Sequence, residues 1–257
     1  MPYLIGLEDR NVMITGAGQG IGRATAQLLF DAGANLTLID VNEEQLDSLS
    51  HSLDAKRVLT RCCSVTDRAE LQRAVNDSVE RFGAIHGLVN NAGITRTAMI
   101  EKMTMEEWDA VIAVNLTGVF NCLQIAGADM LKRGRAGEAA PGAIVNISSD
   151  AGRKGTLGQV NYGAAKAGVL GITMSAAREW GQYGIRVNSV CFGVVATDMT
   201  EVVRSERFRE KYLSSIPLGR FLEADEAARS IAFLVSEAGA HITGQHLSVN
   251  GGSFISA

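Results

Sequence analysis

Short apolar runs rich in β-branched residues alternate with longer amphipathic stretches along the chain, and this alternation restricts the fold more than any other feature. Strands that read as nearly continuous apolar runs are typical of a parallel sheet buried on both faces. The pattern predicts an α/β fold built of βαβ units: one doubly wound domain in which helices flank both faces of a seven-stranded parallel sheet. The seven runs lie at 12–14, 36–39, 58–59, 87–89, 143–147, 187–190 and 246–249.

The sequence contains no Pro- or Ser-rich linker and no low-complexity tract that would divide it. Its 257 residues exceed the usual length of one domain, but α/β folds often reach this length as a single unit. We therefore expect one domain over residues 1–257. In a doubly wound sheet, ligands bind beyond the carboxyl ends of the strands. Gly16, Asp40, the segment 91–93 and Ser149 all fall at such ends.

The charge of the chain argues against nucleic acid and anionic membranes as partners. The net charge is −4, with no block of like charges and no basic stripe. Glu8 and Asp9 stand where a signal peptide would need apolar residues, and no segment approaches about 18 uninterrupted apolar residues. We expect a cytoplasmic enzyme with no nucleic-acid and no membrane partner.

The cysteines and histidines give little support for a metal site. Cys62, Cys63, Cys122 and Cys191 show no CxxC spacing, and we interpret them as buried free thiols. The four histidines are scattered, with no HxxxH pair and no neighbouring cluster of ligands. No metal is expected.

A glycine-rich turn, TGAGQGIG at 15–22, follows the first predicted strand and precedes a helix that begins near Ile21. Glycine lets the backbone turn tightly and approach a phosphate closely. The N-terminus of the helix adds free N–H groups and the positive end of the helix dipole. A chain with 28 glycines forms such patterns by chance, but the strand–turn–helix context is the one that a dinucleotide site requires. The turn predicts a site for a dinucleotide pyrophosphate.

Asp40 closes the second predicted strand, at the distance from the turn where a dinucleotide site has an acidic residue. A carboxylate there accepts hydrogen bonds from the adenosine ribose and repels a 2′-phosphate, and Val41 and Asn42 bring no positive charge. We interpret Arg23, in the first helix, as part of a solvated face. NAD(H) is therefore expected in preference to NADP(H). In an alternative interpretation Asp40 caps the helix that begins near Glu43.

Tyr162 and Lys166 are four residues apart, so they share one face of a helix, and Ser149 lies upstream at the end of a predicted strand. A tyrosine with a pKa of about 10 is a useful acid at neutral pH only if that pKa is tuned. A cation about 4 Å away favours tyrosinate by roughly 4 kcal/mol, or about three pK units. We expect Tyr162 to transfer the proton, Ser149 to bind the substrate oxygen, and Lys166 to tune Tyr162 and hold the nicotinamide ribose. The Tyr-x-x-x-Lys pattern also arises by chance on exposed helices, so its position in the chain carries the argument.

Taken together, these motifs resemble those of the classical short-chain dehydrogenase/reductase family over essentially the whole chain. The resemblance implies a Rossmann fold and a nicotinamide-dependent oxidoreductase. The matching elements are Thr15-Gly16-x-x-x-Gly20-Ile21-Gly22, Asn90-Asn91-Ala92-Gly93, Asn115, Ser149, Tyr162-x-x-x-Lys166 and Val249-Asn250-Gly251-Gly252.

The resemblance also implies roles for individual residues. Asn115, Ser149, Tyr162 and Lys166 would form a catalytic tetrad, with Asn115 helping to bind a water in a proton relay to Lys166. The family pattern further implies a homotetramer in which the helices around Asn115 and Tyr162 pack between subunits. The cofactor contacts expected from the turn, from Asp40 and from the resemblance are Gly16, Gln19, Gly20, Ile21, Asp40, Ser64, Val65, Asn91, Ala92, Gly93, Tyr162, Lys166, Val195 and Thr197.

Within the family, the segments 91–96, 102–104 and 155–162 are similar to those of 3-oxoacyl-thioester reductases. Such enzymes reduce β-ketoacyl groups carried by acyl carrier protein or coenzyme A. A 3-oxoacyl thioester is therefore the leading substrate. Fatty-acid synthesis enzymes usually prefer NADPH, whereas Asp40 favours NADH.

The chain departs from this pattern at several places. Phe192-Gly193 replaces the usual Pro-Gly after the sixth strand. Ser64 stands where many relatives place an Asp or Asn against adenine, which leaves that contact to Ser64 or to the Val65 backbone. Tyr183 takes a position where carrier-protein reductases often have a basic residue. A longer segment, 133–141, precedes the fifth strand.

Two other functions stay open. The same tetrad serves dehydrogenases of sugars, steroids and other secondary alcohols. A non-catalytic NAD-sensing protein is a candidate of another class, although the complete tetrad argues against it. The stretch 197–215 is expected to form a lid over the substrate. Its interleaved arginines and glutamates are either a solvated helical face or a contact for an acidic carrier or coenzyme A phosphates.

Overall fold

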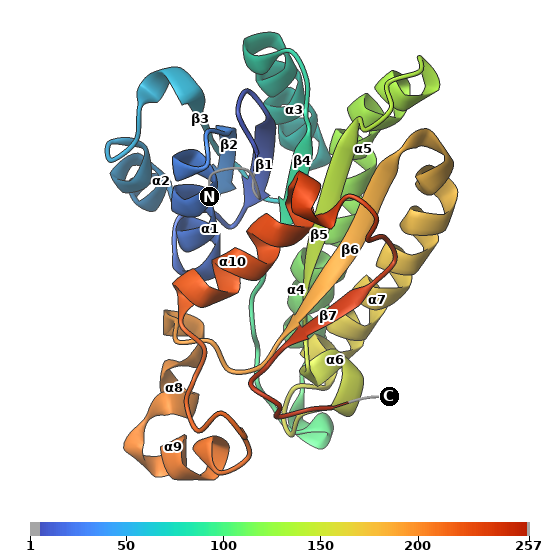
Figure 1. Cartoon of the computed structure of the whole chain (residues 1–257). Coiled ribbons are helices and arrows are strands. Elements are labelled where there is room, and N and C mark those ends of the chain that lie inside the picture. The colour runs from blue at the N-terminus through green and yellow to red at the C-terminus, as the bar shows by residue number, and fades with distance from the viewer. Residues whose placement is uncertain (1–5, 256–257) are drawn as a thin grey trace.

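The computed structural model describes residues 6–255, which form one seven-stranded parallel sheet between two layers of helices (Figure 1). The strand order is β3-β2-β1-β4-β5-β6-β7. Strands β1 to β3 are added toward one edge of the sheet and β4 to β7 toward the other, so the order reverses between the neighbours β1 and β4. Each predicted run lies within one strand, and the predicted doubly wound α/β sheet is confirmed. The strands are β1 (Asn11–Thr15), β2 (Asn35–Asp40), β3 (Val58–Cys62), β4 (Gly87–Asn90), β5 (Gly142–Ser149), β6 (Ile185–Phe192) and β7 (His246–Val249).

The helices form two layers, each of which encloses one half of the apolar core. Helices α1, α2 and α10 pack on one face of the sheet, and α3, α5 and α7 pack on the other. A π-helical turn over Ala113–Thr117 joins α4 to α5. The helices are α1 (Gly20–Asp31), α2 (Glu43–Ser50), α3 (Arg68–Phe82), α4 (Met105–Ile112), α5 (Gly118–Arg135), α6 (Ala151–Lys154), α7 (Val160–Trp180), α8 (Glu201–Arg204), α9 (Glu206–Leu213) and α10 (Ala224–Val235).

Several helices begin at side chains that bind their free N–H groups. Asn42 caps α2, and Asp67 accepts from two N–H groups of α3. Thr104 and Glu107 form a reciprocal capping box at the start of α4. Such caps fix where each helix begins, and therefore which residues remain in the loops at the carboxyl ends of the strands.

The continuous helical segment Met105–Arg135 is long and apolar enough to cross a membrane, by length and composition alone. In the fold, 56% of its most apolar window is buried. The segment contributes α5 to the layer against β4 and β5, and a helix buried in a core passes the same test of length and composition.

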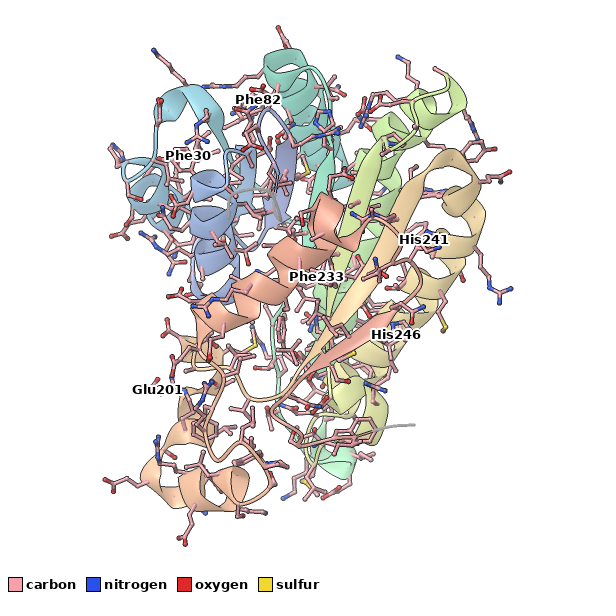
Figure 2. The ribbon with its side chains drawn as sticks, in the orientation of Figure 1. Phe30, Phe82, Glu201, Phe233, His241 and His246 are labelled. Carbon is pink, nitrogen blue, oxygen red and sulfur yellow. The ribbon has the colours of Figure 1, made fainter. Side chains whose placement is uncertain are left out.

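The expected lid segment folds as α8 and α9, which extend beyond the carboxyl ends of the strands (Figures 1 and 2, where Glu201 marks α8). The two ends of this segment lie side by side, because Ala196 N donates a 2.8 Å hydrogen bond to Leu222 O and Leu222 N donates one of 3.1 Å to Val194 O. The segment therefore departs after β6 and returns to nearly the same place before α10 begins.

Candidate active site

The glycine-rich turn joins β1 to α1 and lies against the loop after β4. Gly16 has φ +65°, a left-handed conformation that favours glycine. A Cβ at Gly22 would lie 2.0 Å from Gly16 O, so no side chain fits there. The Asn91 side chain donates to Gly16 O at 2.9 Å and to Thr15 O at 3.1 Å. The Asn91 side chain thus fixes the turn against the loop that follows β4.

Asp40 ends β2 with both carboxylate oxygens bound to backbone. Gly18 N donates to Oδ2 at 2.9 Å, and Asn42 N donates to Oδ1 at 3.0 Å. Helix α2 is capped by the Asn42 side chain, so the alternative in which Asp40 caps that helix is wrong. Arg23, which we interpreted as part of a solvated face, is half-buried and lies within 3.5 Å of Gln45 O.

A cavity of about 470 Å³ opens at the carboxyl ends of the strands, beside this turn. It is lined by every predicted cofactor and catalytic residue except Asn115. Lys166 is the only basic side chain that lines it within residues 6–255. The predicted residues at its wall are Gly16, Gln19, Gly20, Ile21, Asp40, Ser64, Val65, Asn91, Ala92, Gly93, Ser149, Tyr162, Lys166, Val195 and Thr197.

Tyr162 and Ser149 form the polar centre of this cavity. Tyr162 lies in the first turn of α7, and Ser149 ends β5. Burial raises the pKa of the Tyr162 phenol, and a hydrogen bond with the Ser149 side chain opposes this shift in pKa. Tyr162 is therefore protonated at neutral pH and can donate its proton.

Lys166 lies one helical turn further along α7. Its Nζ donates a 2.7 Å hydrogen bond to Ile147 O and stands 5.6 Å from the centroid of the Tyr162 ring. Burial lowers the pKa of Lys166 to about 8. The pKa of Tyr162 is raised, whereas we expected a nearby cation to lower it by about three units. The difference has a physical cause: desolvation of the phenol is the largest effect on Tyr162, and the ammonium is directed to a strand carbonyl.

Asn115 lies in the π-helical turn and is fully buried. Its side chain binds the backbone of Ile94 on both sides, accepting from the N–H at 2.9 Å and donating to the C=O at 3.0 Å. Asn115 itself does not line the cavity, although the neighbouring Val114 does. Asn115 thus holds the loop after β4 in place, and its part in a proton relay stays a prediction.

The lid segment contributes the edge of the cavity through residues 197–200. Arg204 is half-buried and donates to Thr197 O at 3.0 Å and to Thr200 Oγ1 at 3.2 Å. The other basic residues of this segment, Arg207, Arg209 and Lys211, are exposed. Most of its charges therefore lie in solvent, as the alternative of a solvated helical face predicts.

Sequence reasoning missed several residues of the cavity wall. Cys63, which we interpreted only as a buried thiol, lines the cavity beside Ser64. Ile94 lies beside Gly93, one residue beyond the motif that we used. Phe192 replaces the usual proline and is buried, with its C=O accepting from Asp150 N at 3.0 Å. The signal for Cys63 and Phe192 was their position directly after a strand or at its end, and the signal for Ile94 was the loop that follows β4.

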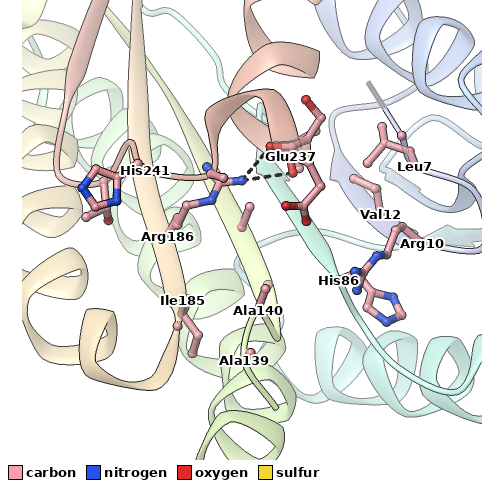
Figure 3. Close-up of a pocket in the computed structure, with 18 of the residues that line it drawn as sticks. Leu7, Arg10, Val12, His86, Ala139, Ala140, Ile185, Arg186, Glu237 and His241 are labelled. Carbon is pink, nitrogen blue, oxygen red and sulfur yellow. Dashed lines mark hydrogen bonds between the residues drawn. The ribbon is translucent and has the colours of Figure 1, made fainter. Parts of the chain in front are cut away.

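A second cavity, of about 420 Å³, lies at the opposite end of the sheet (Figure 3). It contains none of the predicted site residues. Arg186 donates to Leu234 O at 2.7 Å and to Ser236 O at 2.9 Å, and so binds the last carbonyls of α10. His86 accepts at Nδ1 from Asn11 N at 3.1 Å. These side chains stabilise the ends of secondary-structure elements.

The chain is similar to known proteins over nearly its whole length. A family model described as enoyl-(acyl carrier protein) reductase matches residues 16–253. The 3-oxoacyl-[acyl-carrier-protein] reductase FabG of Thermotoga maritima is 44% identical over 251 residues, which cover 97% of this chain and 99% of that protein. FabG of Staphylococcus aureus is 41% identical over 249 residues, which cover 96% and 98%.

Solved structures show the same fold. The glucose/ribitol short-chain dehydrogenase/reductase from Brucella melitensis superposes with a TM-score of 0.91 at 33% identity, covering 98% of this chain and 99% of that one. Levodione reductase superposes with a TM-score of 0.89 at 36% identity, covering 96% and 98%.

Proposed function

This chain belongs to the short-chain dehydrogenase/reductase family of nicotinamide-dependent oxidoreductases, and we propose that it reduces 3-oxoacyl thioesters to 3-hydroxyacyl thioesters with NADH. The observation that carries the proposal is one cavity that joins Ser149 and Tyr162 to the glycine-rich turn. Identity of 44% to a 3-oxoacyl-[acyl-carrier-protein] reductase supports the substrate class.

The residues at the turn fit a dinucleotide. Gln19, at the N-terminus of α1, makes no side-chain cap bond, and Gln19, Gly20 and Ile21 line the cavity. The first N–H groups of a 12-residue helix would thus be available to a pyrophosphate. We propose that the turn holds the pyrophosphate and that Asn91, Ala92 and Gly93 form the wall beside the cofactor.

Side chains of this protein supply the groups for proton transfer. We propose that the Ser149 hydroxyl donates a hydrogen bond to the substrate carbonyl oxygen and that Tyr162 gives that oxygen its proton. The raised pKa of Tyr162 keeps the phenol protonated until the carbonyl reacts. A bound nicotinamide supplies the hydride, so that one hydride and one proton convert the C=O to a CH–OH. The cation of Lys166 stabilises the tyrosinate that remains.

Asp40 supports a preference for NADH. Its carboxylate is fixed at the cavity wall by two backbone N–H groups. A ribose 2′-phosphate next to it would meet a like charge, and Lys166, at the catalytic end, is the only cation that lines the cavity within the described chain. Asp40→Ala should therefore raise the ratio of kcat/KM for NADPH to that for NADH by about tenfold or more. Asp47→Ala, which removes an exposed carboxylate from α2, is the matched control.

We further propose that residues 1–257 form one domain and that the enzyme is a cytoplasmic homotetramer. The four cysteines all lie in the described part of the chain and are free thiols, as is usual in a reducing compartment; Cys62 is exposed, so the expectation that it is buried is wrong. Arg135 lies over the ring of Tyr183, with its guanidinium carbon 5.4 Å from the ring centroid. A basic group thus stands beside the position where carrier-protein reductases often have one, at the amino ends of the strands and opposite the cavity that contains Tyr162.

A second candidate is the oxidation of a secondary alcohol such as a sugar. It is favoured by the glucose/ribitol dehydrogenase whose structure superposes with a TM-score of 0.91. In that reaction Tyr162 would act as the base, and the raised pKa of its phenol would make the reaction faster at alkaline pH.

The proposal is tested by the consumption of NADH and, separately, of NADPH with acetoacetyl-CoA as the acceptor. Turnover with NADH and little with NADPH supports both the substrate class and the role of Asp40. A preference for NADPH contradicts the cofactor proposal and leaves the substrate class. If neither cofactor is consumed, alcohol oxidation with NAD⁺ is measured next, and cofactor binding without any turnover would indicate a sensor.

A further inference from the structure

We propose that Asp150 is a positioning residue, whose buried carboxylate ties the loop after Ser149 to the C-terminal segment 250–254 and so holds the Ser149 hydroxyl in place. This inference rests on the proposed role of Ser149 in carbonyl reduction. Asp150 directly follows Ser149 and is only 4% exposed. It also directly precedes α6, yet its side chain makes no cap bond to that helix. A carboxylate in this position commonly caps, so the direction of this one requires another explanation.

The C-terminal segment supplies the partners of this carboxylate. Asn250 Nδ2 lies 3.0 Å from both carboxylate oxygens, and Ser253 Oγ donates to Oδ2 at 3.0 Å. Lys154 Nζ lies 3.8 Å from Oδ2 and donates to Ser253 O at 3.2 Å. A buried carboxylate is unfavourable unless it is hydrogen-bonded or paired. The position of Asp150 therefore depends on residues about 100 positions later in the chain.

The backbone of Asp150 is bound to β6 at the carboxyl end of the sheet. Its N–H donates to Phe192 O at 3.0 Å, which continues the pairing of β5 with β6 past Ser149. The next N–H, of Ala151, donates to Ser149 Oγ at 3.1 Å. The Ser149 hydroxyl is thus oriented by the first backbone group of α6, and a shift of Asp150 would move that group directly.

The same C-terminal segment also contacts the cavity wall and the end of the lid segment. A Cβ at Gly193, which lines the cavity, would lie 3.0 Å from Asn250 Cβ. Gly251 O accepts from Leu218 N at 3.1 Å, and a Cβ at Gly251 would lie 2.7 Å from Ile216 Cγ2. The segment therefore contacts three parts of the site: the loop after Ser149, the cavity wall after β6, and residues 216–218, which follow the lid segment.

The test uses a reciprocal exchange of the two central partners. Asp150→Asn places an amide N–H opposite the N–H of Asn250, so two donors meet. We expect kcat to fall about 10- to 100-fold, because small displacements of a reacting group cost about this much, while the KM for the cofactor changes less than about twofold. The double variant Asp150→Asn/Asn250→Asp again places one amide opposite one carboxylate, but it removes the 3.0 Å hydrogen bond that Asn250 Nδ2 donates to Phe254 O, so its kcat should recover only in part, by about tenfold.

Two further variants keep the test decisive if Asp150→Asn folds poorly. Ser253→Ala removes a single hydrogen bond from the carboxylate, and should give a smaller loss of kcat in the same direction. Asp129→Asn is the matched control, because Asp129 is a carboxylate at the opposite end of the sheet that accepts from Ile85 N at 3.0 Å and from Arg133. It should lower the melting temperature and leave kcat unchanged.

Amide hydrogen exchange separates this inference from the proposed function, since it needs no substrate. Peptides that cover 148–155 and 213–219 should exchange faster in Asp150→Asn, and the double variant should shift their rates back toward the wild-type rate. If Asp150→Asn and Ser253→Ala lower the melting temperature but keep the wild-type kcat, the inference is overturned. If the wild-type protein shows no turnover, the exchange rates alone decide. Unchanged exchange in Asp150→Asn then overturns the inference. Faster exchange in both segments, slowed again in the double variant, supports it.

Discussion

Lys166 carries a charge that changes within the working pH range of an enzyme. Its pKa is lowered to about 8 because the ammonium is buried. A lysine is charged below its pKa, so the cation is present below pH 8 and is lost as the pH rises through that value. Tyr162 stays protonated over the same range, because burial raises its pKa. At the scale of single residues, the proposed reduction thus depends on whether Lys166 is protonated and therefore charged.

We therefore predict that kcat for carbonyl reduction is level below pH 8 and falls as the pH rises through it. The measurement is a pH profile with saturating cofactor and substrate. In Lys166→Met the fall near pH 8 should be absent and the residual activity low. A wild-type profile that stays flat to about pH 10 would show that the charge of Lys166 is not needed.

The motif residues were predictable from sequence because short patterns in the chain specify them, whereas their contacts were not. Nothing near Lys166 in the sequence indicates that its ammonium binds Ile147 O, since that bond depends on how α7 packs on β5. The pairing of Asn115 with Ile94 and of Asp150 with Asn250 likewise joins segments distant in the chain.

At the scale of secondary-structure elements, the turn between β1 and α1 tolerates no side chain at Gly22. A Cβ there would lie 2.0 Å from Gly16 O and 2.6 Å from Asn91 Nδ2. We predict that Gly22→Ala displaces the N-terminus of α1 and weakens NADH binding by about tenfold or more. Isothermal titration with NADH measures this change.

Gly181→Ala is the control for that variant. Gly181 has φ −57° and no atom within 4 Å of an added Cβ, so alanine fits its conformation and its surroundings. Its affinity for NADH and its melting temperature should stay close to those of the wild type. Equal affinity in Gly22→Ala and Gly181→Ala would contradict the role of the turn.

The positions of the strands were predictable, but their ends were less so. Continuous apolar runs mark strands buried on both faces, and all seven runs fall within strands. The predicted run at 187–190 belongs to a strand that continues to Phe192, because pairing with β5 extends to Ser149. No local sequence pattern predicts the π-helical turn at Asn115. The Asn115 side chain in that turn binds the backbone of Ile94, which lies 21 residues earlier in the chain.

At the scale of the whole molecule, helices α5 and α7 lie side by side and carry exposed apolar side chains. Phe120 is 45% exposed and Met174 is 47% exposed. We predict a homotetramer that buries both side chains between subunits. Light scattering coupled to size exclusion should give four times the mass of one chain.

Phe120→Glu and Met174→Glu should each shift the protein to smaller species, because a buried charge opposes association. Val202→Glu is the control, since Val202 is 70% exposed on α8, away from these helices. A wild-type protein that elutes as a monomer, or variants that keep the wild-type mass, would contradict the proposed assembly.

The central claim is that Tyr162 donates the proton in a nicotinamide-dependent carbonyl reduction. It is tested most directly by Tyr162→Phe, with turnover of NADH and acetoacetyl-CoA and the Kd of NADH measured on the same preparation. Loss of the phenol hydroxyl should lower kcat by about 10²- to 10⁴-fold, while the Kd of NADH stays within about twofold of the wild type. Near-normal turnover in Tyr162→Phe would contradict the claim.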